Sequence, residues 1–422
     1  MSYPRSISLI LIILILAACK PIPITPTPSP APPIPTLTPE PGMPAVSIAR
    51  HPAMANFSFI NPDPSLPKYN PASTDPSQID YRSADLSALD LSGSGADLLY
   101  AIFDSHTTWP EASKMPAGFD WQKIMEIGKN PGLGMRALHA QGLTGKGIGI
   151  AIIDQTLLVD HIEYRSRLRL YEEYDDAVGA VSSMHAPAVA SIAVGKTLGV
   201  APEADLYFIA TGTCGFIIRA EDLNFDCHAK AVRRVIAINQ GLPESRKIRV
   251  LSMSIGWTPQ SKGYAEITSA VEAAKAAGIF VISTSLSDTD GLYFNGLGRT
   301  ALDDPDKFTS YLPGSWWSSK FYAGQTRTPQ QILLVPMESR STASPTGPQD
   351  YVHYPSGGAS WAVPYLAGTY ALAAQVKPDV TPEEFWATAL QTGQTIQIAH
   401  DGKTYTLGTI LDPQALIAAL HP

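Results

Sequence analysis

The sequence predicts an α/β domain of three layers, in which a mostly parallel central sheet is covered by helices on both faces. Continuous apolar runs of strand length alternate along the chain with longer segments of helical periodicity. This alternation is typical of right-handed βαβ units, whose helices bury both faces of a parallel sheet. In such sheets, binding and reacting side chains gather at the carboxyl ends of the strands.

The individual elements follow from these runs. The expected strands are rich in Val, Ile and Leu, and they are Ile148–Ile153, Asp205–Ala210, Arg249–Ile255, Ile279–Thr284 and Gln331–Pro336. The expected helices are Ala186–Val194, Ala229–Asn239, Ala265–Ala277 and Trp361–Gln375. Because the composition changes at Gly118, we expect the α/β domain to span residues 118–422.

The composition excludes some classes of function. The 422 residues are 45% hydrophobic and 16% charged, with a formal net charge of -8. This length is ample for a buried core, and the mild acidity argues against a nucleic-acid partner, which requires a concentrated Lys/Arg surface. The sequence contains no His-Glu-x-x-His segment and no cysteine pair with zinc spacing, so no metal or other cofactor is predicted. Asp303–Asp306 is expected to be a solvated turn rather than a calcium loop.

Residues 1–18 predict an export signal. Arg5 precedes the apolar run Ile7–Ala18, which is shorter than the roughly 20 residues that a transmembrane helix needs. The run ends in Leu-Ala-Ala-Cys, which resembles the lipobox of bacterial lipoproteins. That resemblance implies lipidation of Cys19, and a location in the bacterial cell envelope, anchored on the extracytoplasmic side of a membrane. The alternative is an ordinary secretory signal in which the cysteine is incidental.

Two further segments precede the α/β domain. Residues 19–45 are dominated by Pro and Thr, which favours an extended tether. Residues 46–117 are irregular and rich in Pro, Ser and Asp, with a short helix expected near Ala96–Phe103. This N-terminal extension is expected either to wrap the main domain or to serve as a propeptide.

Two cysteines lie beyond the signal. In an exported protein, a disulfide between Cys214 and Cys227 is the favoured expectation, and two buried free thiols are the alternative.

Three residues occupy positions that suit catalysis. Asp154 ends an expected strand, so its carboxylate projects from the sheet. His185 opens an expected helix, where the positive end of the helix dipole favours the neutral imidazole that a general base requires. Ser360 also opens a helix, where unpaired N–H groups favour developing negative charge. Each residue alone also fits a structural role, such as a strand-ending Asp, a packed His or a Ser N-cap.

The order Asp, His, Ser and the surroundings of each residue resemble the subtilase family of serine peptidases. Gly358–Pro364 is similar to the family's Gly-Thr-Ser-Met-Ala-x-Pro motif, and His185–Ala190 is similar to its His-Gly-Thr-His-Val-Ala motif. Three further blocks carry the resemblance, which extends over about Gly142–Gln391: His161, Gly199–Ala204, and Ser252–Gly256, the last resembling the strand that lines the substrate groove.

The resemblance implies a subtilisin-like fold and hydrolysis of peptide bonds through an acyl-enzyme. In that mechanism Ser360 is the nucleophile, His185 takes and returns the proton, and Asp154 supports the imidazolium. The implied partner is a protein or peptide substrate, whose backbone would bind along Ser254, Ile255 and Gly256.

The sequence also departs from the family's pattern. Gln155-Thr156 follow the catalytic Asp in place of Thr/Ser-Gly, and Ala186 replaces the Gly after the His. Trp257 follows Gly256 where the family has a second Gly, and we expect its indole to narrow the groove.

The most serious departure concerns the oxyanion hole. Ser287 stands at the position of the family's oxyanion Asn and is the first candidate to replace it, because a hydroxyl can donate a hydrogen bond. Asn295, from a nearby loop, and backbone donors alone are the other candidates.

Two rival functions remain at this stage. The chain could be a catalytically impaired subtilase-fold protein that binds peptides, or a lipid-anchored solute-binding protein. Retention of all three triad residues favours the peptidase over both. The pair Trp316-Trp317 is expected to be a core aromatic pair rather than a substrate-facing loop.

Overall fold

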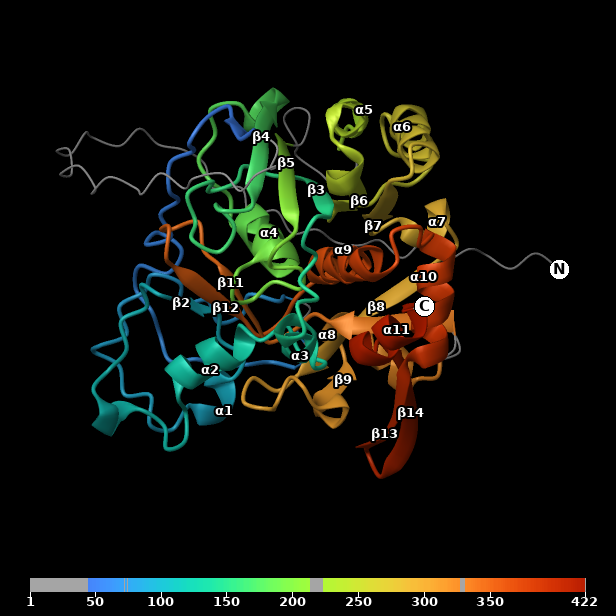
Figure 1. Cartoon of the computed structure of the whole chain (residues 1–422). Coiled ribbons are helices and arrows are strands. Elements are labelled where there is room, and N and C mark those ends of the chain that lie inside the picture. The colour runs from blue at the N-terminus through green and yellow to red at the C-terminus, as the bar shows by residue number, and fades with distance from the viewer. Residues whose placement is uncertain (1–44, 72, 74, 213–222, 327–330, 422) are drawn as a thin grey trace.

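A six-stranded, fully parallel sheet forms the centre of the molecule (Figure 1), in the order β1-β4-β5-β3-β6-β7. Its strands are β1 (Ser47–Ile48), β3 (Gly149–Asp154), β4 (Leu168–Tyr174), β5 (Asp205–Thr211), β6 (Ile248–Met253) and β7 (Phe280–Ser283). The computed structural model describes residues 45–71, 73, 75–212, 223–326 and 331–421. The prediction of a parallel central sheet is confirmed.

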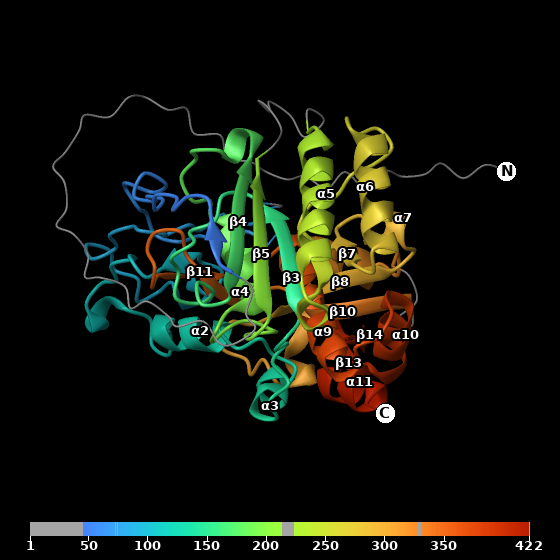
Figure 2. The same cartoon turned by 45° about the horizontal axis from the view of Figure 1, so that its top comes forward.

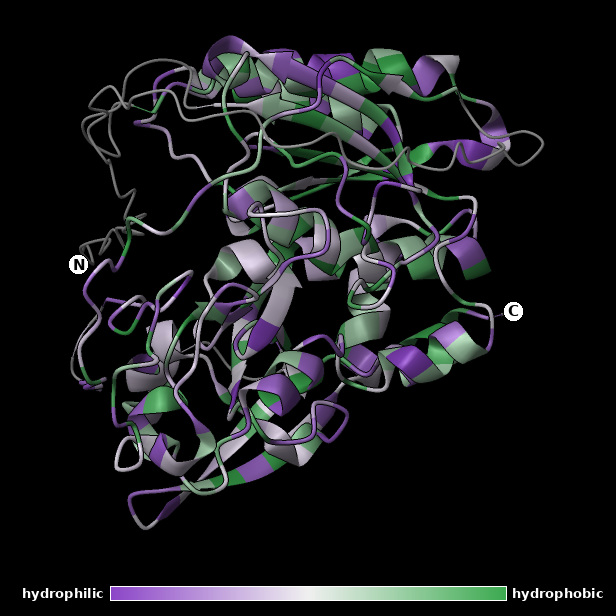
Figure 3. Ribbon diagram, turned by 90° about the vertical axis from the view of Figure 1, so that its left-hand side faces the viewer, coloured by the Kyte–Doolittle hydropathy of each residue, from purple (hydrophilic) through white to green (hydrophobic). Residues whose placement is uncertain are grey.

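Helices cover both faces of this sheet. On one face α5 (Asp226–Gly241) and α6 (Tyr264–Ala276) lie side by side (Figure 2), and on the other lie α4 (His185–Val194) and α9 (Ala359–Val376). Figure 3 shows apolar residues along the strands and hydrophilic residues mainly on the outer helices and loops. The helices α4 and α9 are buried almost throughout, which explains why their sequences are apolar on every side.

Two smaller sheets complete the fold. The five-stranded sheet has the order β13-β14-β10-β8-β9, and the three-stranded antiparallel sheet has the order β11-β12-β2. Their strands are β2 (Phe103–Asp104), β8 (Tyr293–Arg299), β9 (Tyr311–Pro313), β10 (Ile332–Pro336), β11 (Arg340–Ala343), β12 (Tyr351–Tyr354), β13 (Gln394–His400) and β14 (Lys403–Ile410).

The remaining helices lie around these sheets. They are α1 (Gly95–Leu98), α2 (Trp121–Gly128), α3 (Met135–Ala140), α7 (Leu286–Thr289), α8 (Ser315–Tyr322), α10 (Pro382–Thr392) and α11 (Pro413–Leu420). Among the residues that the structure describes, no helix combines the length and apolarity needed to span a membrane. Cys19, most of the tether and the signal segment lie outside the described residues.

The N-terminal extension packs against the main domain and contributes strands to two of its sheets. It supplies β1 to the central sheet and β2 to the three-stranded sheet. Shortly after β1 in the sequence, Arg50 Nη2 lies 2.6 Å from Glu173 Oε1 in β4. The extension also has a small apolar cluster of its own, which includes Ile79, Leu86 and Leu98. The helix expected near Ala96–Phe103 is the single turn α1, followed by β2.

One cysteine of the predicted pair can be placed. Cys227 lies in α5, is almost fully buried and is disulfide-bonded. Cys214 lies outside the described residues, so the pairing of these two cysteines stays a prediction.

Candidate active site

Asp154 and His185 meet at the carboxyl end of the central sheet. Asp154 is the last residue of β3 and only 8% exposed, and its Oδ1 lies 2.8 Å from His185 Nδ1. The same oxygen accepts a 2.8 Å hydrogen bond from the backbone N–H of Gln155, which fixes the carboxylate. Because an ionised carboxylate can only accept, Nδ1 carries the proton and Nε2 is left as the basic nitrogen.

The pKa of His185 is set by two opposing influences. Burial lowers this pKa, but the charge of Asp154 and the hydrogen bond that the imidazole donates to it outweigh burial, so the pKa of His185 is raised above its ordinary value. His185 is the first residue of α4, and the sequence predicted that the helix N-terminus would favour the neutral imidazole. That prediction is wrong in its net direction, because the nearby carboxylate dominates.

Ser360 lies in the first turn of α9, beside the loop that follows β6. Its Oγ donates a 3.3 Å hydrogen bond to the carbonyl of Ser254, and Ser254 Oγ donates a 2.9 Å bond to the carbonyl of Ser360. The side chain next to the serine, Trp361, has its ring centroid 5.4 Å from that of His185. The fold therefore brings all three predicted residues to one region.

The Ser360 hydroxyl is turned away from the imidazole in this structure. Among the described residues, no hydrogen bond joins Ser360 Oγ to His185. Hydrogen bonds between catalytic groups often form only when substrate is bound. Transfer of the Ser360 proton therefore requires the hydroxyl to exchange the Ser254 carbonyl for Nε2 of His185.

The predicted substrate-binding residues form a partly exposed segment that is hydrogen-bonded to the neighbouring loop. Ser254, Ile255 and Gly256 are half-buried and follow β6 directly. The carbonyl of Ile255 accepts a 3.2 Å hydrogen bond from the N–H of Thr284, just after β7. A Cβ on Gly256 would lie 2.4 Å from Thr284 Oγ1, so only glycine permits this close approach.

Trp257 does not narrow the groove. The side chain is only 3% exposed, and its ring centroid lies 5.8 Å from that of Phe225 in the apolar core beneath α5 and α6. Ser285 holds this geometry, because its Oγ accepts from the Trp257 N–H at 2.7 Å and donates to the Trp257 carbonyl at 2.8 Å. The expectation of a narrowed groove is therefore wrong.

The oxyanion candidates take positions that the sequence did not predict. Ser287 lies within the short helix α7, and its side chain makes no hydrogen bond to the residues described. Asn295 lies in strand β8, in register with Leu334 of β10, and not in a loop. By contrast, the N-cap Gly358 offers no side-chain cap, so the first N–H groups of α9 remain as donors beside Ser360.

His161 and the tryptophan pair have structural roles. His161 is fully buried, and its Nε2 lies 2.8 Å from the carbonyl of Asp350. Trp317 is a core residue whose Nε1 donates to the Gly296 carbonyl at 2.6 Å, but Trp316 is 49% exposed. The prediction of a core aromatic pair thus holds for one of its two members.

A buried carboxylate near this region carried no sequence signal. Glu338 follows β10 and is 9% exposed, and burial raises its pKa to about 7. Its Oε1 accepts from the backbone N–H of Ser315 at 2.8 Å and from the Ser315 hydroxyl at 2.5 Å, at the start of α8. Within the described residues, no group of three or more His, Cys, Asp or Glu side chains is arranged to hold a metal ion.

Comparisons with known proteins place the chain in a family. The family model described as "Subtilase family" matches residues 145–408. The serine protease AprX of Bacillus subtilis (strain 168) is 26% identical over 293 residues, which cover 58% of this chain and 61% of that protein.

Two solved structures also align with the chain. The prenylagaramide maturation protease PagA aligns at 17% identity over 68% of this chain and 99% of that one, with a TM-score of 0.47. A protease from Pseudoalteromonas arctica PAMC 21717 aligns at 19% identity over 71% of this chain and 97% of that one, with a TM-score of 0.45.

Proposed function

Because this chain belongs to the subtilase family, we propose that it is a serine endopeptidase that uses Asp154, His185 and Ser360 to hydrolyse peptide bonds. The observation that supports this most directly is the 2.8 Å contact between Asp154 Oδ1 and His185 Nδ1, beside the helix whose first turn carries Ser360. A protein or peptide is therefore the proposed substrate, bound along Ser254–Gly256.

The chemistry follows from the positions of these groups. His185 Nε2 removes the proton from the Ser360 hydroxyl as its oxygen attacks the substrate carbonyl, and Asp154 stabilises the imidazolium that forms. The imidazolium then gives the proton to the leaving amine, so the C–N bond breaks and an acyl-enzyme remains. Water, activated by the same imidazole, releases the acid and restores the serine.

We propose that backbone N–H groups supply most of the oxyanion hole. Gly358 gives the first turn of α9 no side-chain cap, so backbone N–H groups beside Ser360 are available as donors to the developing oxyanion. Ser287 remains a candidate for the second donor only if α7 rearranges when substrate binds, because its hydroxyl contacts no catalytic residue in the structure.

The first experiment is covalent labelling with a fluorophosphonate probe. We expect the protein to label at Ser360, and both labelling and peptide hydrolysis to disappear in Ser360→Ala while the thermal unfolding temperature is retained. Ser87→Ala is the matched control, because it removes an exposed serine hydroxyl outside the site. Absence of labelling in the folded wild-type protein would favour the alternative function, a catalytically impaired subtilase-fold protein that binds peptides.

We further propose that the protein is exported and held on the extracytoplasmic side of a bacterial membrane by a lipid on Cys19. The short apolar run and the small residues before Cys19 support this proposal. In cells that express the full chain, Cys19→Ser is expected to move the protein from the membrane fraction to the soluble extracytoplasmic fraction. Cys227→Ser, which leaves the signal untouched, is the control, and membrane retention of Cys19→Ser would contradict the lipid anchor.

A further inference from the structure

The N-terminal extension contacts both chain segments that lead into the catalytic residues. The carbonyl of Ala53 accepts a 2.9 Å hydrogen bond from the N–H of Ser182, three residues before His185. The carbonyl of Pro76 accepts a 3.0 Å bond from the hydroxyl of Ser356, four residues before Ser360. The extension is thus hydrogen-bonded both to the segment that precedes His185 and to the segment that precedes Ser360.

A second connection runs through strand β12. In the three-stranded sheet, β2 of the extension pairs with β12 through Asp104 opposite Val352 and Phe103 opposite His353. The next residue of β12, Tyr354, is 4% exposed, and burial raises its pKa to about 12, an increase that the nearby charge of Arg82 opposes. The extension therefore packs against the strand that carries Tyr354.

Aromatic contacts continue from Tyr354 to the catalytic base. The ring centroids of Tyr354 and Trp361 lie 5.5 Å apart at an interplanar angle of 68°, and those of Trp361 and His185 lie 5.4 Å apart at 45°. Both distances fall in the range of favourable aromatic pairs. Trp361 stands where the family motif has Met, so a methionine at this position could not make the same ring contact.

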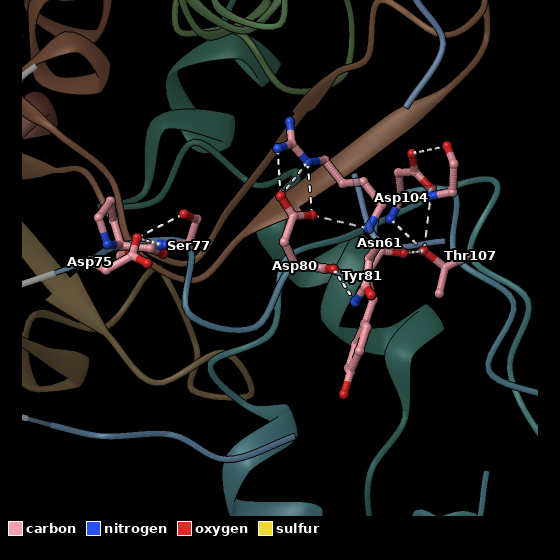
Figure 4. Close-up of polar contacts among 11 residues, drawn as sticks. Asn61, Asp75, Ser77, Asp80, Tyr81, Asp104 and Thr107 are labelled. Atoms are coloured by element: carbon pink, nitrogen blue, oxygen red, sulfur yellow. Dashed lines mark hydrogen bonds and ion pairs between the residues drawn. The ribbon is translucent and has the colours of Figure 1, made fainter. Parts of the chain in front are cut away.

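The extension itself is rigid at the point of contact. Figure 4 shows the polar contacts around Asp80, Tyr81 and Asp104, all of which belong to the extension. Arg82 lies against both oxygens of Asp80, with Nη2 to Oδ2 at 2.6 Å, and both side chains are about nine-tenths buried. The Thr107 hydroxyl donates to the Tyr81 carbonyl at 2.7 Å.

We propose that the N-terminal extension is a positioning element of the active site, which remains with the mature enzyme and holds the His185 imidazole through Tyr354 and Trp361. This inference rests on the proposed function, in which His185 is the base. Trp361 is the positioning residue that touches the base, and Tyr354 joins it to the strand that pairs with the extension. The extension is therefore part of the enzyme and not a segment that must leave before catalysis.

The test is the titration of the His185 imidazole by NMR, assigned with a His185→Gln variant, because this measurement does not need activity. In Trp361→Met we expect a further rise in the His185 pKa, because the indole contributes to the burial that lowers it. Trp361→Phe, which keeps a ring, should restore most of the wild-type value. Trp386→Met, a change of another buried tryptophan away from the site, should leave it unchanged.

Arg82→Met tests the part that the extension plays. We expect Arg82→Met to move the His185 titration in the same direction as Trp361→Met, and to have little further effect when the two changes are combined. Arg50→Met removes an arginine from the same extension that contacts Glu173 instead, so it should not move the titration. Equal effects of Arg82→Met and Arg50→Met, or full additivity with Trp361→Met, would overturn the inference.

The mass of the labelled enzyme gives an independent outcome. Protein labelled by the fluorophosphonate probe is expected to retain residues 46–117. If the labelled species lacks them, the extension is dispensable and the inference is wrong, although the peptidase assignment stands. If the wild-type protein fails to label while the His185 titration responds as expected, the proposed peptidase function fails and the positioning contacts stand.

Discussion

Asp154→Asn is expected to lower kcat by about 10⁴-fold while leaving the fold intact. An asparagine amide at this position donates to Nδ1 of His185, so the ring proton moves to Nε2. The nitrogen that must accept the Ser360 proton is then already protonated. The loss should therefore appear in kcat and in the rate of fluorophosphonate labelling, with little change in the unfolding temperature.

The pH profile of the same variant tests the electrostatic argument. The acid limb of kcat/KM reports the pKa of the base in the free enzyme, so in the wild-type enzyme activity should rise with pH through a His185 pKa above its ordinary value. Asp154→Asn removes both influences that raise this pKa and leaves burial, which lowers it, so the acid limb should move to lower pH. Asp160→Asn is the control, because this carboxylate contacts the exposed His51 at 2.8 Å. It should change neither kcat/KM nor the pH of its acid limb. An acid limb that does not move would show that a group other than His185 is the base.

Asp104→Ala is expected to destabilise the extension by roughly 3 kcal/mol, because it removes a buried carboxylate that accepts several hydrogen bonds. Asp104 is 1% exposed, and it accepts from the Ser83 N–H at 2.9 Å, the Ser83 hydroxyl at 3.0 Å and the His106 N–H at 3.0 Å. Urea unfolding and limited proteolysis of residues 46–117 measure the effect.

The matched control for this prediction is Asp85→Ala in the same segment. Asp85 is exposed and accepts a 3.0 Å hydrogen bond from the Ser87 N–H, so its removal should change stability far less than removal of Asp104. If both variants lose the same stability, the Asp104 contacts do not hold the extension together.

The elements that the sequence predicted are those with continuous apolar runs. Strand β3 is buried at every position, and the predicted run differs from it by one residue at each end. Strand β4 was not predicted, because its charged residues break the pattern. Arg169 in β4 is nevertheless 6% exposed, because it donates a 2.9 Å hydrogen bond to the buried Asp205. Such a pairing between residues distant in sequence leaves no local signal.

The sequence predicted the positions of residues that lie at strand ends and helix starts. It did not predict the side-chain positions that depend on contacts between loops. The positions of Asp154, His185 and Ser360 follow from strand ends and helix starts, which the apolar pattern locates. The direction of the Trp257 indole depends on hydrogen bonds with Ser285, and the position of Ser287 depends on the short helix α7 that contains it. These are contacts between two loops, so neither segment's own sequence reveals them.

The strands that the extension supplies also close the sheets against self-association. Without β1, strand β4 would become the outermost strand of the central sheet, and without β2 the same would hold for β12. Unpaired strand edges are templates for pairing with another chain. We therefore expect a protein without the extension to aggregate, because two strand edges would be left unpaired. It would also lose the proposed positioning of His185.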